Sequence, residues 1–189
     1  MTMTDFQSWV ETVTSEIRSA LQSVSADEVA ELQREILGAK RIFVAGKGRS
    51  GLFLRGFAMR LMHLGLHVHV VDEVTTPAIA VGDVLVLASG SGRTASLVQY
   101  ANKAKEIGAT LVLITTSPDS PVGRQADKIV HIPAPSVKAE GGSGIHSSQP
   151  MANLFEQSLA LLLDITSLQL MKALSKTGEQ MFARHANLE

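Results

Sequence analysis

The stretch Arg41-Ile-Phe-Val-Ala-Gly-Lys-Gly-Arg-Ser-Gly51 decides the fold of this 189-residue chain. An apolar run that passes directly into glycines is typical of a buried parallel strand ending in a tight loop. Residues 50–64 then follow a helical pattern that stops at Gly65. Strand, glycine-rich loop and helix in succession form the repeating unit of a parallel sheet.

The same alternation continues along the chain. Further strands are expected at His67–Val71, Val84–Ala88, Thr110–Thr115 and Lys128–Ile132. Helices are expected at Asp5–Val24, from Ser25 or Asp27 to Leu37, at Thr94–Ile107, Pro121–Ala126 and Met151–Leu174. Continuous apolar strands separated by helices predict a three-layer α/β/α sandwich around a five-stranded parallel sheet.

These elements fit one domain over residues 1–189. It comprises N-terminal helices at 5–37, an α/β core at 40–133, a loop at 133–149, and a C-terminal helix and tail at 150–189. The loop contains three glycines and has no periodicity, and a loop of this length is usually functional or mobile, for example as a lid. The tail from Thr177 has a polar, helix-like pattern without an evident core face.

The composition excludes several classes of protein. The formal net charge is −1, which argues against a nucleic-acid protein and against an electrostatic membrane binder. Cysteine is absent, so disulfides and thiolate catalysis are excluded, and a reducing cytoplasm is expected. The most apolar segment, Met151–Leu174, carries Glu156 and Asp164 and fails as a membrane span. We expect a cytoplasmic globular domain that binds a small molecule or itself.

Two loops carry the pattern of a phosphate site. The first contains Gly48, Arg49 and Ser50 directly before a helix, where glycines and free backbone N–H groups suit an anion. Ser50 can serve there as the N-cap or as a hydroxyl donor. The second loop, Ser89-Gly-Ser-Gly-Arg-Thr94, brings three hydroxyls to another strand-to-helix turn. Helix capping alone accounts for only one or two of those hydroxyls.

A dinucleotide site is the competing interpretation of the first loop. Gly46–Gly51 matches G-x-G-x-x-G, and Asp72 follows about 20 residues later, near the end of the second predicted strand. That pattern is weak on its own, and it leaves the serines of the second loop unexplained.

Taken together, the two loops resemble the sugar isomerase (SIS) domain family, in which serines and threonines cradle a sugar phosphate. The likeness extends in order along the chain to further motifs, which are similar to the 6-phospho-3-hexuloisomerase branch of that family. They are Phe57–Gly65, Thr76–Ile79, Gly82-Asp83, Ser89–Thr94, Gln149–Met151, Leu154–Gln157 and Arg184–Glu189.

The resemblance implies a Rossmann-like or flavodoxin-like fold and the interconversion of D-arabino-hex-3-ulose 6-phosphate and D-fructose 6-phosphate. This reaction is the second step of formaldehyde fixation by the ribulose monophosphate route. The resemblance also implies no cofactor and no metal, and a homotetramer whose active sites lie near subunit contacts.

Such a reaction needs a general base that reaches two neighbouring carbons, and Glu156 is the candidate. It lies within the apolar run Met151–Leu163, which leaves little room for a solvated helix face. His185 in the tail and His63 near a helix end are the candidate proton-transfer partners, and His146 lies in the glycine-rich loop.

Other residues are candidates for binding rather than proton transfer. Arg49 can neutralise the phosphate or stabilise the enediolate, and Lys47 can do the same. Thr76 follows the second strand and is a candidate contact for a substrate hydroxyl. The phosphate itself is assigned to the two loops, through Gly48, Arg49, Ser50, Ser89, Ser91 and Thr94.

Two alternatives stay open at this point: another SIS-type isomerase, for example of arabinose 5-phosphate, and a non-catalytic sugar-phosphate regulator. A regulator needs a DNA-binding module, and residues 5–37 carry seven acidic side chains against two arginines, which repels DNA. The apolar faces of Asp5–Val24 and Met151–Leu174 exceed what one chain of this size covers, which predicts a homo-oligomer, a dimer or a tetramer.

Overall fold

The computed structural model describes residues 6–135 and 146–188. Five parallel strands form one sheet in the order β2-β1-β3-β4-β5. The strands are β1 (Ile42–Gly46), β2 (Val68–Val70), β3 (Val84–Ala88), β4 (Thr110–Thr115) and β5 (Lys128–His131). The predicted five-stranded parallel sheet is therefore confirmed, with boundaries within two residues of those expected.

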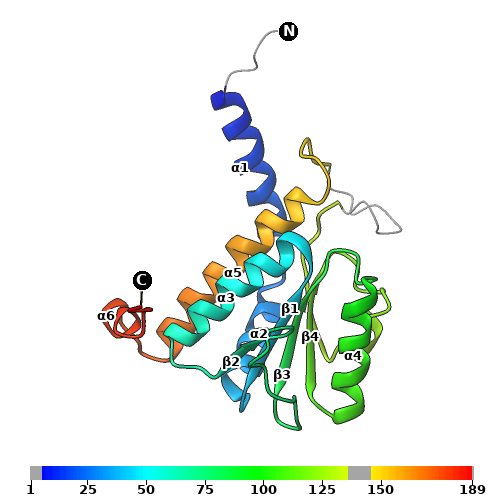
Figure 1. The fold of residues 1–189 in the computed structure, drawn as a ribbon. Helices are drawn as coiled ribbons and strands as arrows, with labels where there is room; N and C mark the ends of the chain where they lie inside the picture. Colours follow the sequence, from blue (N-terminus) through cyan, green and yellow to red (C-terminus); the bar gives the residue numbers. More distant parts are fainter. Residues whose placement is uncertain (1–5, 136–145, 189) are drawn as a thin grey trace.

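Helices cover both faces of this sheet (Figure 1). They are α1 (Phe6–Gln22), α2 (Ala26–Gly38), α3 (Gly48–His63), α4 (Ala95–Ile107), α5 (Asn153–Ala173) and α6 (Gly178–Phe182), with a 3₁₀ turn η1 (Gly123–Gln125). Helices α2, α3 and α5 lie on one side, and α4 lies on the other. Helix α1 packs on α5 and projects beyond the body of the domain.

Alternate residues of the strands build two separate hydrophobic cores. In β1, Ile42 and Val44 face the core under α3 and α5, whereas Phe43 and Ala45 face the core under α4. All four are at most 5% exposed. A strand buried on both faces needs no polar alternation, which explains why each strand reads as an unbroken apolar run.

Two segments differ from their sequence predictions. The helix expected at Pro121–Ala126 is only the 3₁₀ turn η1. The tail contributes more than expected: a capping box between Thr177 and Gln180 starts α6, and its Met181 packs against the larger core. The prediction that the tail has no core face is therefore wrong at Met181.

The predicted lid cannot be compared in full with the structure, because residues 136–145 of the loop 133–149 lie outside the described residues. Within residues 6–135 and 146–188, none of the helices has the length and apolar character needed to cross a membrane.

Candidate active site at the carboxyl ends of the strands

The site lies where the chain changes direction across the sheet. After β1 the next strand, β2, is added on one side, and β3 is then added on the other side of β1. The loops that follow β1 and β3 therefore diverge and leave a crevice at the carboxyl ends of these strands, where open α/β sheets bind ligands.

The first loop brings the start of α3 close to the end of β1. A Cβ atom on Gly51 would lie 2.5 Å from the carbonyl oxygen of Gly46, so only glycine allows this approach. Gly48 has φ +58°, a conformation that favours glycine. Lys47 is the N-cap of α3, so the N-cap alternative for Ser50 is wrong. Ser50 is only 7% exposed and instead lines a cavity between this loop and the next.

The second loop holds its serines by local hydrogen bonds. The backbone N–H of Gly92 donates to Ser89 Oγ at 3.1 Å, and that of Arg93 donates to Ser91 Oγ at 3.3 Å. Both bonds use the hydroxyl as an acceptor, so each serine keeps an O–H that can donate to an anion. Thr94 is the N-cap of α4, but its side chain makes no capping hydrogen bond.

A cavity of about 180 Å³ joins the two loops to the start of α5. Its polar wall comes from both loops and includes Lys47, Ser50, Ser89, Ser91 and Thr94. Its opposite wall comes from α5 and the residues just before it: Met151, Ala152, Phe155 and Glu156. Hydroxyl donors therefore face a carboxylate across this cavity.

Arg49 and Glu156 form the charged pair at this site. The guanidinium Nη1 of Arg49 lies 2.8 Å from Glu156 Oε2 and also donates to Asn153 Oδ1, one turn earlier on α5. The guanidinium carbon Cζ of Arg49 lies 5.8 Å from the ring centroid of Phe53. The Glu156 side chain is 18% exposed, so the carboxylate is shielded but still open to the cavity.

Glu16 of α1 fixes the segment that leads into this helix. Its carboxylate accepts hydrogen bonds from Ser147 Oγ at 2.7 Å, Ser148 N at 2.8 Å and Gln149 Nε2 at 3.0 Å. Partial burial raises the pKa of Glu16, but these hydrogen bonds outweigh it and hold the pKa below its usual value. The N-terminal helix therefore supports the cavity wall from a distance.

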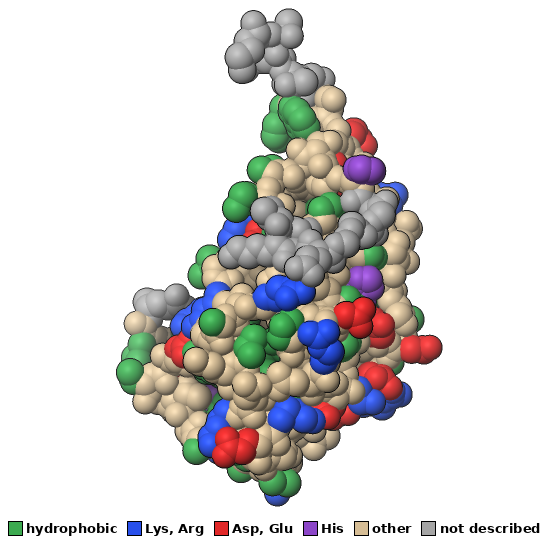
Figure 2. Space-filling model, turned by 90° about the vertical axis from the view of Figure 1, so that its right-hand side faces the viewer, with side chains coloured by type: hydrophobic (Ala, Val, Ile, Leu, Met, Phe, Trp, Pro, Cys, Tyr) green, Lys and Arg blue, Asp and Glu red, His purple; other side chains and the backbone are tan. Residues whose placement is uncertain are grey.

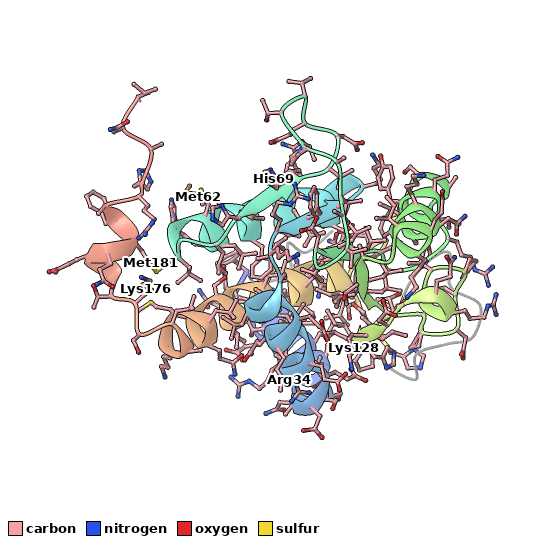
Figure 3. All side chains as sticks on the ribbon, turned by 90° about the horizontal axis from the view of Figure 1, so that it is seen from below. Arg34, Met62, His69, Lys128, Lys176 and Met181 are labelled. Carbon is pink, nitrogen blue, oxygen red and sulfur yellow. The ribbon has the colours of Figure 1, made fainter. Side chains whose placement is uncertain are left out.

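The two candidate histidines meet each other rather than Glu156. The rings of His63 and His185 stack at 5.5 Å, and His63 is only 3% exposed beneath this contact. They lie at the far end of α3, where α6 packs; Figure 3 shows Met62 and Met181 at that same end. Arg49 opens α3 and His63 closes it, so at 1.5 Å per residue they are about 20 Å apart.

Thr76 also lies away from the cavity. Its hydroxyl donates to the carbonyl of Val70 at 2.6 Å, and the residue borders a different hollow beside β2. Arg93 borders a third hollow, with Thr116 and Arg124. His146 is exposed in the part of the loop that is described.

Sequence reasoning missed Asn153 and Phe155. Asn153 precedes Glu156 by three residues and therefore shares its helix face, a spacing that could have identified it. The position of Phe155 in the cavity wall had no such signal. Among the described residues, no group of three or more His, Cys, Asp and Glu side chains could hold a metal ion.

A family model described as the SIS domain matches residues 35–162. The chain belongs to the SIS domain family. Two relatives in that family are named 3-hexulose-6-phosphate isomerase. The one from Bacillus subtilis is 41% identical and covers 96% of this chain and 97% of its own length. The one from Mycobacterium gastri is 46% identical, and the match covers 94% of this chain and 88% of that protein.

Solved SIS structures have the same fold. A protein from Methanococcus jannaschii, for which its crystal structure inferred a function of 3-hexulose-6-phosphate isomerase, is 33% identical to this chain. The match covers 96% of this chain and 99% of that one, with a TM-score of 0.83. The predicted membership of the SIS family, drawn from the serine-rich loop and the motifs around it, is confirmed.

Proposed function

We propose that this chain is a 6-phospho-3-hexuloisomerase, which interconverts D-arabino-hex-3-ulose 6-phosphate and D-fructose 6-phosphate. One observation carries the proposal: a single cavity brings the hydroxyls of two loops together with Glu156, whose carboxylate pairs with Arg49. The relatives that bear this activity in their names are similar to nearly the whole chain, which supports the same reaction here. The absence of cysteine fits a cytoplasmic enzyme.

In this proposal the serine-rich loops hold the phosphate group. Ser50, Ser89, Ser91 and Thr94 donate hydroxyl hydrogen bonds, and the N-terminus of α3 adds backbone N–H groups and a partial positive charge. The sugar chain then extends toward α5. Few fixed charges are needed, which agrees with the nearly neutral composition.

Glu156 acts as the general base. Its carboxylate removes the proton from C2 of the 3-ulose, which leaves a cis-enediolate across C2 and C3. Return of that proton to C3, together with transfer of the O2 hydroxyl proton to O3, gives the 2-ulose, so one carboxylate serves both carbons. Arg49 stabilises the negative charge that develops on the enediolate oxygens. As its guanidinium turns to these oxygens, the Glu156 carboxylate is released to accept the proton.

Exchange with deuterated water tests this reaction. Fructose 6-phosphate incubated with the protein is expected to take up deuterium at C3, as followed by NMR. Deuterium at C1 instead would indicate an aldose–ketose isomerase, and no exchange at high protein concentration would overturn the isomerase proposal. Coupling to a hexulose phosphate synthase then identifies the substrate directly.

We propose further that the protein is a homo-oligomer and that His185 is the proton-transfer partner in the active site of a neighbouring subunit. Apolar side chains on α1 and α5 remain exposed, among them Phe6 at 73% and Leu168 at 60%. The hydrophobic side chains on the projecting α1 are visible in Figure 2. Within one chain the histidines lie too far from Glu156, and His63 is buried beneath His185.

Subunit complementation tests the shared site. Glu156→Gln and His185→Asn are each expected to lack activity alone. Hybrid oligomers of the two variants contain sites with both an intact carboxylate and an intact histidine, so activity is expected to return. Hybrids that form but stay inactive would show that the site is not shared in this way.

A further inference from the structure

Lys47 separates two cavities at the carboxyl ends of the strands. On one side it lines the phosphate cavity together with Ser50 and Ser89. On the other it lines a cavity of about 240 Å³ between the ends of β1 and β2, where Asp72 also forms part of the wall. Lys47, although its side chain is 43% exposed, therefore borders the cavity that the proposed function assigns to the substrate.

Two further residues fix the ammonium group of Lys47. Its Nζ lies 2.6 Å from Asp72 Oδ2, in the loop after β2. The other carboxylate oxygen, Oδ1, accepts a hydrogen bond of 2.5 Å from the hydroxyl of Tyr100 on α4. The Lys47 ammonium also lies 5.5 Å from the centroid of the Tyr100 ring, at cation–π distance.

The backbone conformation of Asp72 is an unfavourable one, which the contacts with Lys47 and Tyr100 accompany. Its φ is +78°, in the left-handed region that residues with a Cβ atom adopt rarely. The hydrogen bond that Lys47 donates to the Asp72 carboxylate raises the pKa of Lys47, so the ammonium stays charged. An ammonium has three N–H donors, so pairing with Asp72 leaves others for an anion.

The two cations near the cavity have different partners. Arg49 is already engaged by Asn153 and Glu156 on α5, which is the end of the cavity that holds the reacting carbons in the proposed function. In the proposed function the phosphate lies at the serine end, whose lining includes Lys47. Two cations with different partners allow phosphate binding and enediolate stabilisation at the same time.

We propose that Lys47 is a second cationic contact for the substrate phosphate, and that Asp72 and Tyr100 are positioning residues that hold its ammonium group at the cavity wall. This proposal rests on the proposed function where it names a sugar phosphate as the ligand. It also gives Asp72 a role other than the ribose contact of a dinucleotide site, because both carboxylate oxygens are engaged by protein groups.

Calorimetric titration of the full-length protein with inorganic phosphate and with fructose 6-phosphate tests the contact. Lys47→Met is expected to weaken both affinities about tenfold, the effect of losing one charge-assisted hydrogen bond, and to raise KM with little change in kcat. Lys105→Met is the matched control: Lys105 pairs with Asp127 at the opposite end of the sheet. Unchanged phosphate affinity in Lys47→Met would overturn the proposal.

A double-mutant series tests the positioning role. Asp72→Asn and Tyr100→Phe are each expected to weaken phosphate binding about threefold, because the ammonium loses its fixed position. In the Lys47→Met background the same changes are expected to have no further effect. Additive losses there would mean that Asp72 and Tyr100 act independently of Lys47.

The two proposals fail in different ways. A wild-type protein that does not turn over the ketose phosphates overturns the proposed function. The inorganic phosphate titration still decides the role of Lys47 in that case, because it needs no turnover.

Discussion

Replacing Glu156 by glutamine is the sharpest test of the proposed mechanism. The amide has nearly the same shape as the carboxylate, and its oxygen can still accept from Arg49 Nη1, which lies 2.8 Å from Glu156 Oε2. The substitution therefore removes the negative charge and the proton acceptor while it preserves the packing at the start of α5.

The structure separates the expected effects on stability and on rate. Arg49 is 43% exposed and Glu156 18%, and a part-exposed ion pair contributes at most about 1 kcal/mol to the free energy of unfolding. Loss of a general base typically slows a reaction by about 10² to 10⁴, which is roughly 3–5 kcal/mol of activation free energy. Turnover is therefore expected to fall far more than stability.

Three measurements follow this variant: kcat, deuterium uptake at C3 of fructose 6-phosphate, and the affinity for inorganic phosphate. The first two are expected to fall together, and the third to stay within about threefold. Glu73→Gln is the matched control, because Glu73 pairs with Arg55 at 2.7 Å outside the phosphate cavity. Its kinetics are expected to be unchanged.

Retention of more than a third of the wild-type kcat in Glu156→Gln would refute the assignment of this residue as the base. Parallel loss of phosphate binding and of the thermal transition would refute the separation of binding from chemistry. Glu156→Asp, which keeps the charge but withdraws it by one methylene, is expected to retain partial activity and tests whether position matters as well as charge.

Three further predictions concern binding and stability. Ser89→Ala is expected to weaken phosphate binding about three- to tenfold with little change in kcat, as measured by titration and steady-state kinetics; unchanged affinity would make this serine a purely structural part of its loop. Gly51→Ala is expected to lower the free energy of unfolding by about 2 kcal/mol or more because its Cβ meets backbone at 2.5 Å, whereas Gly56→Ala, with open space around it, should raise that free energy by about 0.5–1 kcal/mol in urea titrations. Burial raises the pKa of Asp83, but hydrogen bonds from Arg41 outweigh this effect and hold the pKa below its usual value. The charged Asp83 therefore stabilises the fold fully at pH values above the usual pKa. This stabilisation is lost as the pH falls through the lower pKa of the folded state. Urea titrations between pH 6 and pH 3 should therefore show a weaker acid dependence in Asp83→Asn; an unchanged slope would contradict this.

The sheet could be predicted because its signal is local. The strands are short and apolar on both faces, and those that carry the site are followed by a glycine or serine loop. Such a pattern can be recognised without knowledge of the neighbouring strands. The hydroxyls of the second loop could be recognised for the same reason: their number exceeds what a helix cap needs. Their place in one cavity with Ser50 then follows from the parallel arrangement, since the carboxyl ends of β1 and β3 meet at one edge.

The tail shows where local reasoning fails. The tail has a polar sequence pattern, and none of the residues of the short helix α6 is fully buried. The packing of Met181 against the core therefore depends on where α3 and α5 end. The contact of His63 with His185 has the same origin, because it joins positions more than a hundred residues apart.

By itself the sequence determined the parallel sheet, and it singled out two loops as candidate phosphate sites and Glu156 as a candidate base, because each depends on residue types at short and fixed spacings. The tertiary structure alone decided which groups meet. Arg49 pairs with Glu156 because α3 and α5 begin at the same edge of the sheet. Lys47 meets Asp72 and Tyr100 because the loop after β2 and helix α4 converge over the end of β1. Such partners are set by the packing of elements that are distant in the sequence. No local sequence pattern specifies the distance between them.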